Sequence, residues 1–497
     1  MPSKDATLEK IVAWSKRRGF VYQTSDIYGG LANNYDYGPY GTQLKNNIRD
    51  LWWKKFVLDR EDIVGLDGAI ITHPRVWEAS GHTENFNDLI VEDKQNNKRY
   101  RADHIIEDKI GKLDENALNR LLEAYNDLKK KNGGSFPIEF VRLQEIINSR
   151  KFEGHEPEIF DEIIDVLKLK SPDGNELGKV KALNQLFETH IGAFEDDKDV
   201  AYLRGETAQS IFQNFQNVVD SMRVRVPFGI AQIGKAFRNE ITKGQFLFRT
   251  IEFEQMEVEY FIDPKSDWEP VMKDLKQEAM EFYMLIGAPL NDLRFREHLD
   301  EELSHYSIGT FDIEYNFDYG WKEMAGIAHR TDFDLSRHSE FSGKNLKYRD
   351  PVSNEVYTPH VLEPSFGLSR AVIMSMYAAY TEEDLGDGKS RVVLKFPKHL
   401  APVTAAIFPL QKDEKLQDLA KSTFEDLKQK FVMEYDNAGN IGKMYRRQDE
   451  IGTPFCITID FDSLEDKSAT VRDRDTMKQE RVKLADLESY LQKQIEG

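Results

Sequence analysis

The sequence contains a single cysteine, Cys456, among its 497 residues. One thiol excludes an internal disulfide and any zinc site built from several cysteines, and it suits a reducing compartment. No apolar run reaches the roughly 18 residues that a membrane-spanning helix requires. The charged start, residues 1–10, has no apolar core of the kind that a secretory signal peptide carries. These absences predict a soluble, cytoplasmic protein.

Positive charge is scarce, because 67 Lys and Arg residues stand against 87 Asp and Glu residues, for a net charge of −20. This charge opposes bulk attraction to polyanions, so a nucleic-acid partner would need a local basic surface or specific contacts. The chain is 40% hydrophobic and 31% charged, which allows large buried cores and excludes a mainly disordered protein. Its length predicts about three domains of ~150 residues.

Several catalytic signatures are missing. The segment 385–390, Leu-Gly-Asp-Gly-Lys-Ser, ends like a phosphate-binding loop, but Glu383 stands where the first glycine is needed and would repel phosphate. The sequence has no Gly-x-Ser-x-Gly elbow and no cluster of metal-ligating His and Cys residues. His104 and His329 stand beside candidate site residues, although a lone histidine is more often structural than a ligand or base.

Hydrophobic spacing predicts a helix over 42–57, with an apolar stripe of Leu44, Ile48, Leu51, Trp52 and Phe56. The preceding stretch 27–41 is rich in glycine and aromatic residues and predicts a packed loop, either structural or functional. The stretch 107–170 is rich in Lys, Glu and Leu, with a helical run at 118–128. It predicts a solvated helical insertion, whose charges form either a wetted surface or a partner contact.

Two strands joined by a basic turn at 243–245 are predicted at 228–234 and 250–262, where β-branched and aromatic residues are frequent. The last hundred residues predict a separate α/β domain, preceded by a linker at 381–388. Its expected elements are a strand at 402–410, a helix carrying Leu416 to Phe431, a turn at 437–442, strands at 455–461 and 469–472, and a helix at 479–494.

Two arginines flank the basic turn, and their guanidinium forks could converge on one polyphosphate. They are Arg238, in Phe-Arg-Asn-Glu, and Arg249, in Arg-Thr-Ile-Glu-Phe. Phe253 offers a flat face on which a base could stack. In strict alternation Glu257 shares a face with Phe253, which suits a polar pocket better than an apolar core. The alternative is a charged edge strand.

A second candidate element is Glu-Pro-Ser-Phe-Gly-Leu-Ser-Arg at 363–370, which leads into an apolar helix. Gly367 permits close backbone approach, and Arg370 falls in the first turn of the helix. A buried arginine requires an anionic partner, because an unpaired charge is strongly destabilising in a low-dielectric interior. A bound phosphate would supply that partner, and an internal salt bridge is the alternative.

The order F-R-x-E, loop, R-x-x-x-F and a late G-Φ-x-R resembles motifs 2 and 3 of the class II aminoacyl-tRNA synthetases. The wider match, over about residues 10–482, resembles the dimeric α2 type of glycyl-tRNA synthetase. The motifs that carry it are Asp26-Ile-Tyr-Gly-Gly-Leu, Asp36-Tyr-Gly-Pro, Val76-Trp-Glu-Ala-Ser-Gly-His, Tyr100-Arg-Ala-Asp, Leu203-Arg-Gly-Glu-Thr-Ala-Gln, Phe253-Glu-Gln-Met-Glu, Gly326-Ile-Ala-His-Arg and Glu363-Pro-Ser.

The resemblance implies a glycine–tRNA ligase, in which glycine and ATP form glycyl-adenylate and pyrophosphate before glycine passes to the 3′ end of tRNA(Gly). It implies catalytic roles for Arg238 at the α-phosphate and Arg370 at the γ-phosphate, with adenine stacked on Phe253. The implied ATP-binding residues are Arg238, Asn239, Glu240, Phe248, Arg249, Thr250, Ile251, Glu252, Phe253, Glu323, Met324, Gly367, Leu368, Ser369 and Arg370.

The resemblance also implies an acidic glycine pocket, in which Glu206, Glu257 and Glu363 grip the ammonium group and Ser365 crowds the α-carbon. A tight wall excludes larger amino acids, so no editing domain is expected. The implied glycine-binding residues are Arg101, Glu206, Phe253, Glu254, Gln255, Met256, Glu257, Glu363, Pro364, Ser365, Phe366 and Gly367.

The implied fold is an α+β catalytic domain on an antiparallel sheet flanked by helices, with a C-terminal α/β anticodon-binding domain. The expected division is a catalytic core at 1–106 and 171–385, a helical insertion at 107–170 and the anticodon-binding domain at 390–497. A homodimer built through the motif 1 segment is implied, with Pro74 near its end. The run 442–447, Gly-Lys-Met-Tyr-Arg-Arg, suits RNA contact, although a solvated turn is the alternative.

Mg²⁺ is expected with ATP, and Glu323 is a candidate ligand. No zinc is expected, because Ser171-Pro-Asp-Gly-Asn-Glu lacks the cysteines that some relatives carry. Three positions depart from the family pattern, and the first two are expected to loosen the loop that bears Glu206. They are Gly205, Ser210 and Ser369.

Two other functions stay open at this point. One is a class II synthetase for another amino acid, such as proline or threonine. The other is an inactive, synthetase-like RNA-binding protein. The acidic residues argue against the first alternative, and the retained arginines argue against the second.

Overall fold

The computed structural model describes residues 6–85, 87–110, 119–120, 122–123, 157–192, 199–240, 245–299, 307–386 and 388–496. Most of the predicted insertion at 107–170, including most of the helical run at 118–128, lies outside the described residues, as do two of the three residues of the predicted turn at 243–245. The chain divides into two compact units. The first comprises Met1–Ala69, Glu206–Ala236 and Phe246–Gly497, and the second comprises Ile70–Gly205 and Phe237–Gln245.

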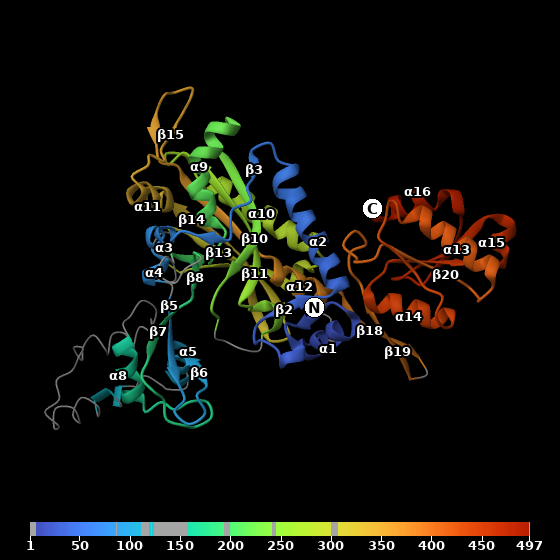
Figure 1. Cartoon of the computed structure of the whole chain (residues 1–497), viewed down its shortest axis with the longest axis horizontal. Helices are drawn as coiled ribbons and strands as arrows, with labels where there is room; N and C mark the ends of the chain where they lie inside the picture. The colour runs from blue at the N-terminus through green and yellow to red at the C-terminus, as the bar shows by residue number, and fades with distance from the viewer. Residues whose placement is uncertain are drawn as a thin grey trace. The chain divides into compact units, whose positions relative to one another are not determined.

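A seven-stranded sheet forms the centre of the first unit (Figure 1). The pairs β12–β13, β13–β14, β14–β17 and β17–β11 are antiparallel, and the last pair, β10–β3, is parallel. The predicted antiparallel sheet is therefore confirmed. The strand order is β12 (Leu293–Glu297), β13 (Thr310–Phe317), β14 (Gly320–Thr331), β17 (His360–Gly367), β11 (Glu252–Ile262), β10 (Phe228–Phe237) and β3 (Ile63–Gly65).

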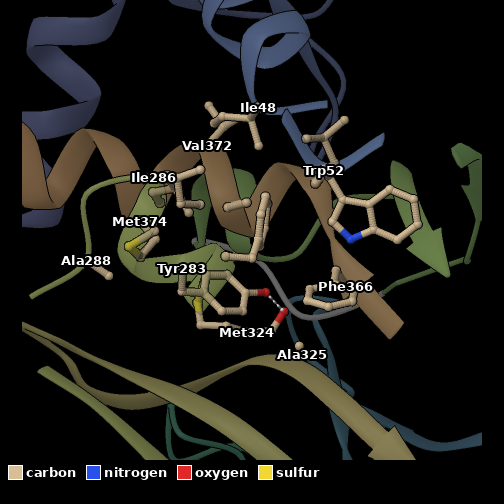
Figure 2. Packing of buried hydrophobic residues seen from close by; sticks show 14 of the residues in the cluster. Ile48, Trp52, Tyr283, Ile286, Ala288, Met324, Ala325, Phe366, Val372 and Met374 are labelled. Carbon is tan, nitrogen blue, oxygen red and sulfur yellow. Dashed lines mark hydrogen bonds between the residues drawn. The ribbon is translucent and has the colours of Figure 1, made fainter. Parts of the chain in front are cut away.

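One face of this sheet packs against three helices, α2 (Pro39–Trp53), α10 (Glu269–Leu285) and α12 (Leu368–Ala379). The predicted helix at 42–57 is confirmed, and it continues beyond Trp53 through a wider turn to Leu58. Its apolar stripe is buried apart from Leu51, which is partly exposed. Figure 2 shows Trp52 of α2 in the same cluster as Tyr283 of α10 and Val372 of α12.

The opposite face of the sheet packs against α9 (Ala208–Met222) and α11 (Phe333–Ser342). Phe215 of α9 lies 4.7 Å from Phe261 and 6.1 Å from Phe228, measured between ring centroids. Further along β11 this apolar packing gives way to charged side chains, which form the candidate site described below.

The predicted packed loop at 27–41 is only partly packed. Its middle forms β2 (Tyr35–Tyr37), which pairs with β1 (Val21–Gln23), and its last three residues begin α2. Its start is strongly exposed, at 88% for Ile27 and 85% for Tyr28. The expectation of packing is wrong there, because two consecutive left-handed glycines turn the chain after Tyr28.

The C-terminal α/β domain contains a five-stranded sheet in the order β21 (Met433–Tyr435), β20 (Ala405–Pro409), β22 (Phe455–Ile459), β23 (Ser468–Asp473) and β24 (Gln479–Lys483). Figure 1 shows α13 (Glu414–Leu427) and α16 (Leu487–Glu496) on one side of β20 and α14 (Ile441–Ile451) on the other.

Three expectations for the C-terminal region are corrected. Residues 479–483 form a strand paired with β23 rather than the start of the last helix. The run 442–447 is helical, because the Asn440 side chain accepts a hydrogen bond from the Lys443 amide and caps α14. The expected linker at 381–388 falls largely in β18 (Tyr380–Gly386), which pairs with β19 (Lys389–Leu394).

The second unit contains two three-stranded sheets. One has the order β6 (Arg99–Arg101), β5 (Asn87–Glu92) and β7 (Lys181–Asn184), and the other has the order β4 (Ile71–Thr72), β9 (Asp199–Leu203) and β8 (Phe187–Ile191). In the first sheet, α5 (Ala102–Ile110) and α8 (Pro157–Leu167) supply much of the apolar core.

A buried carboxylate, Asp93, joins two turns of the second unit. It accepts hydrogen bonds from the amides of Gln95 and Asn96, from the Ser171 hydroxyl at 2.6 Å and from the Asn175 side chain at 3.0 Å. Burial raises the pKa of Asp93, but these hydrogen bonds outweigh it and hold the pKa at about 2. The turn at 171–176, which has no cysteine, is thus held by a hydrogen-bonded carboxylate.

A search of the described residues for a helix that is both long and apolar enough to span a bilayer finds none.

Candidate active site

Strand β11 separates two kinds of side chain, as its alternation predicts. Met256 and Val258 point into the apolar core, and Glu254 on that face pairs with Lys45 of α2. Glu257 lies on the opposite face and is 2% exposed. A carboxylate so deeply buried needs hydrogen-bond donors around it.

Three side chains supply those donors to Glu257. The Thr207 hydroxyl donates to one carboxylate oxygen, and Gln255 and Ser365 donate to the other at 2.8 and 2.7 Å. The contact with Ser365 follows from the sheet, since these two residues lie directly opposite each other in the β11–β17 pair. Two residues that are 108 positions apart in the chain therefore meet.

Glu363 lies on the same face of β17 and pairs with the buried guanidinium of Arg330 on β14. Nη1 of Arg330 donates to both Glu363 oxygens at 2.9 and 3.0 Å. The rest of the guanidinium fork donates to both oxygens of Asp334 at 2.8 and 3.0 Å. Burial raises the pKa of Glu363 to about 7; Arg330 opposes the rise, and Glu257 and Glu206 add to it.

The network continues to Glu206, which precedes α9. The Gln209 amide donates to Glu206 and to Asp334, at 2.9 Å each, and its oxygen lies 2.7 Å from Nε2 of His338. Glu206 is thereby joined to the same network as Glu363 and Arg330.

Ser210, expected to loosen the loop that bears Glu206, instead holds it. Its hydroxyl donates to the Thr207 carbonyl at 2.8 Å and accepts from Gln232 at 2.7 Å. The Gln232 amide also donates to the same carbonyl at 2.7 Å. The Ser210 side chain therefore stabilises this loop through hydrogen bonds.

Glu259 lies one step further along the same face of β11. It is fully buried, and neither of its oxygens has a hydrogen-bond partner among the described residues. Burial raises its pKa well above the usual range, and the negative charge of Glu363 adds to the rise.

Arg370 lies in the first turn of α12, as predicted, with its side chain 26% exposed. Its guanidinium donates to the Glu323 carbonyl at 3.0 Å, pairs with the Glu323 carboxylate at 3.1 Å and stands 4.5 Å over the Phe248 ring. The internal salt bridge considered above is therefore present. Since the Glu323 side chain is 49% exposed, the guanidinium remains at the surface of the site.

Of the other predicted site arginines, Arg238 and Arg101 belong to the second unit and Arg249 to the first. Nε of Arg238 donates to the Gly205 carbonyl at 3.0 Å, and the amide of Asn239 donates to the Gln185 carbonyl at 2.8 Å. Arg101 pairs with Asp88 at 3.1 Å and with Asp103.

Directly before β11, the Ile251 amide donates to the Asn33 carbonyl at 2.9 Å. The Thr250 hydroxyl donates to the Glu252 carbonyl at 2.9 Å, and Glu252 itself pairs with Lys235. Phe253 is only partly buried, on the same face as Glu257.

Besides Phe248, four of the predicted site residues have their side chains in the apolar core, so any contact these four make with a ligand would come from their backbone. Figure 2 shows two of them there, with the Tyr283 hydroxyl donating at 2.8 Å to the Met324 carbonyl. The four are Met256, Met324, Phe366 and Leu368.

Sequence reasoning missed three residues that build the site, Thr207, Arg330 and Asp334. Arg330 ends the segment Gly-Ile-Ala-His-Arg, which was noticed as a motif but given no role. Asp334 stands four residues later and pairs with it. That spacing is a usable signal, although the third partner, Glu363, could be found only through the pairing of β14 with β17.

Among the described residues no group of three or more His, Cys, Asp and Glu side chains is arranged to hold a metal ion. The Glu323 carboxylate pairs with Arg370, and its charge adds to the burial that raises the pKa of Asp312, whose own carboxylate lies 2.8 Å from Nε2 of His298. A pair of carboxylates leaves most positions around a cation to other ligands, as Mg²⁺ sites on nucleotides do.

The candidate site therefore contains two chemically different groups of side chains. Glu206, Glu257 and Glu363 belong to one hydrogen-bonded cluster rich in carboxylate, a chemistry that suits a small cation such as an ammonium group. Arg370 offers a guanidinium beside an aromatic ring, which suits an anion. The two lie close in sequence, because β17, which carries Glu363, leads into α12 at Gly367.

Comparison with known proteins finds two family models in the chain. Residues 189–381 match the tRNA synthetase class II core domain (G, H, P, S and T), and residues 404–494 match an anticodon binding domain. These matches confirm the predicted class of fold.

Curated relatives align over nearly the whole chain. The glycine–tRNA ligase of Caldanaerobacter subterraneus subsp. tengcongensis is 46% identical over 100% of both chains. Those of Clostridium acetobutylicum and Geobacillus thermodenitrificans are also 46% identical, over 99% of this chain and 99% and 98% of their own. A prolyl-tRNA synthetase of Cryptosporidium parvum, solved with halofuginone and AMPPNP, shares the fold with a TM-score of 0.60 at 13% identity, covering 99% of this chain and 79% of that one.

Proposed function

The chain belongs to the glycine–tRNA ligase family of class II aminoacyl-tRNA synthetases, and from this premise we propose how its residues bind glycine and ATP. Its activity is the ATP-dependent ligation of glycine to tRNA. A carboxylate oxygen of glycine attacks the α-phosphorus of ATP, the bond to the β-phosphate breaks, and glycyl-adenylate and pyrophosphate form. A hydroxyl of the terminal adenosine of tRNA then attacks the carbonyl carbon, and AMP leaves.

We propose that Glu206, Glu257 and Glu363 bind the ammonium group of glycine, with Ser365 against its α-carbon. The observation that carries this proposal is the register of β11, β14 and β17, which brings Glu257, Ser365 and Glu363 to one buried face. The hydrogen bond to Glu257 holds the Ser365 hydroxyl in place, so the hydroxyl cannot move aside for a substrate side chain. Glycine has no side chain and is therefore the amino acid that fits. Arg101 is an additional expected contact.

We propose that Arg238 binds the α-phosphate of ATP and that Arg370 binds its γ-phosphate. Adenine would stack on Phe253, and Arg249 would contact the nucleotide. Adenylate formation requires little acid–base chemistry. It requires the two reacting groups in line and cations that stabilise the developing charge. The ring of Phe248 under Arg370 and the Glu323 contact support this role, because they hold the guanidinium in one orientation.

Class II synthetases in general use Mg²⁺ with ATP, and the residues here fit that requirement. Glu323 offers carboxylate oxygens, the donors that Mg²⁺ prefers, beside the arginine proposed for the γ-phosphate, and Asp312 is a second carboxylate close enough for the charge of Glu323 to raise its pKa. We propose them as its protein ligands. The ion would neutralise charge on the triphosphate and the departing pyrophosphate.

We further propose that the C-terminal domain binds the anticodon region of tRNA(Gly). The exposed side chains of Lys443 and Arg446 on the capped helix α14 support this, whereas Tyr445 packs against the sheet and its hydroxyl lies 2.7 Å from that of Thr458. The division into a core at 1–106 and 171–385, an insertion at 107–170 and an anticodon-binding domain at 390–497 is part of the same proposal, as are a homodimer and a cytoplasmic location.

The experiment that tests the proposal is ATP–pyrophosphate exchange with each amino acid in turn. Exchange with glycine alone is expected. Exchange with proline or threonine would assign the pocket to another amino acid, and no exchange at all would leave an RNA-binding protein. Ser365→Val and Glu363→Gln are each expected to raise the glycine KM at least tenfold while the ATP KM changes little. Normal glycine kinetics in both variants would overturn the pocket assignment.

A further inference from the structure

Glu259 is a buried carboxyl to which the proposed function gives no role. It is fully buried, and neither of its oxygens has a hydrogen-bond partner among the described residues. An ionised carboxylate in such surroundings is strongly disfavoured, because burial removes its hydration and nothing replaces it. The side chain therefore needs either a proton or a counter-charge.

The sheet register places Glu259 against Glu363. In the antiparallel β11–β17 pair, Glu257 lies opposite Ser365 and Tyr260 lies opposite Leu362, with no shift in register between them. Position 259 therefore falls opposite position 363. Side chains of directly opposite residues stand on the same face with their Cβ atoms about 5 Å apart, and two like charges there destabilise the pair.

Only one of these two carboxyls has a cationic partner that the structure identifies. Glu363 accepts two hydrogen bonds from Nη1 of Arg330, whose remaining fork is bound to Asp334. The charged groups that act on Glu259 are Glu257 on its own strand, Glu363 on β17, Arg330 on β14 and Asp334 on α11. The buried polar side chains of Gln232 on the adjacent β10 and of Gln209 on α9 are neutral. The three carboxylates Glu257, Glu363 and Asp334 outnumber the single guanidinium, so no positive charge remains to balance an ionised Glu259.

We propose that Glu259 is a positioning residue of the amino-acid pocket, which carries a proton and shares it with Glu363 across the β11–β17 pair. Two carboxyl groups with one proton bear a single negative charge, and that charge stays on the member held by Arg330. Glu259 thereby keeps Glu363 ionised and fixed in place for the ammonium group. This inference rests on the proposed function, because it assigns the task that Glu363 performs.

The test uses the full-length enzyme and glycine-dependent ATP–pyrophosphate exchange. Glu259→Gln retains the shape and a hydrogen-bond donor, so it is expected to keep the glycine KM within about threefold of wild type at pH 7.5. Glu259→Leu fills the space but cannot donate, and it is expected to raise the glycine KM about tenfold with little change in the ATP KM. The matched control is Glu363→Gln, the same chemical change on the opposite residue, which is expected to raise the glycine KM strongly.

A second readout reports the proton itself. A carboxyl whose pKa is raised by folding binds its proton more tightly in the folded state, so its stabilising effect is complete at acid pH and is lost as the pH rises. Glu259→Gln cannot titrate. Its melting temperature relative to wild type is therefore expected to be higher at pH 8 than at pH 5.

Three results would overturn the proposal. A glycine KM in Glu259→Gln as high as in Glu363→Gln would mean that Glu259 is ionised and binds the ammonium group itself. Equal glycine KM values for Glu259→Leu and Glu259→Gln would mean that no proton is shared. A difference in melting temperature between Glu259→Gln and wild type that is the same at both pH values would mean that Glu259 carries no proton. The melting temperatures and the kinetics of Glu259→Gln test the proposal even if Glu259→Leu does not fold. Wild-type enzyme that fails to exchange with glycine would instead refute the proposed function.

Discussion

Replacing Arg330 by glutamine removes the one cation seen between two buried carboxylates. Its guanidinium makes four hydrogen bonds of 2.8 to 3.0 Å, two to Asp334 and two to Glu363. The side chains of Arg330 and Asp334 are 3% and 1% exposed, so water does not replace the lost partner. Breaking a buried ion pair from one side destabilises a protein by about 3–5 kcal/mol. We expect Arg330→Gln to reduce the free energy of unfolding by that amount, measured by urea unfolding.

The same substitution is expected to weaken glycine binding in a pH-dependent way. Arg330 lowers the pKa of Glu363, which burial otherwise raises, and the balance lies at about 7. Without the guanidinium the pKa rises further, so at pH 7 less of Glu363 is ionised. The ionised fraction falls about fivefold for the first unit of that rise and about tenfold for each later unit. The glycine KM should therefore rise at pH 7 and recover towards pH 9, as judged by pyrophosphate exchange.

Arg337→Gln is the matched control, since Arg337 lies on α11 and pairs with Glu340 at the surface, at 3.4 Å. An exposed pair of this kind contributes about 0.2–1 kcal/mol, and its loss should leave the glycine KM unchanged. The reasoning is refuted if Arg330→Gln unfolds at the same urea concentration as Arg337→Gln and binds glycine equally well at both pH values.

Three further outcomes are expected. Asp93→Ala should lower the melting temperature in calorimetry, because it leaves four donors without their acceptor. In wild type, the stabilisation by the ionised Asp93 carboxylate is present above about pH 4 and is lost as the pH falls towards about 2, because the pKa of Asp93 is lowered. Lys443→Gln should raise the KM for tRNA and reduce the salt dependence of tRNA binding by about one unit of slope, whereas pyrophosphate exchange, which requires no tRNA, should continue. Tyr283→Phe should destabilise the core by about 1 kcal/mol in urea unfolding, because the buried Met324 carbonyl loses its hydroxyl donor.

Local patterns predicted the elements that carry the site. The spacing of Leu44, Ile48, Trp52 and Phe56 predicted α2, because a helix that buries one face must repeat apolar residues every three or four positions. The alternation along β11 predicted that Glu257 and Phe253 share a face. The helix that carries Arg370 in its first turn was also predicted.

The contacts that build the pocket could not be predicted in this way. The meeting of Glu363 with Arg330, and of Ser365 with Glu257, depends on the register between strands far apart in the chain, which no local spacing reports. The start of α14 was missed for a different reason. Asn440 stands in a glycine-containing stretch that predicts a turn, and the same residue type caps helices.

The passage from β17 into α12 has a consequence for how the enzyme can change. Glu363 and Ser365, proposed for the amine, and Arg370, proposed for the triphosphate, stand on one uninterrupted strand-to-helix segment with no loop between them. The regular backbone of this segment therefore fixes the separation between the residues proposed for glycine and the arginine proposed for the triphosphate. A single inserted or deleted residue in the segment would move Arg370 relative to Glu363 and Ser365 and abolish adenylate formation, even if every contacting side chain were kept.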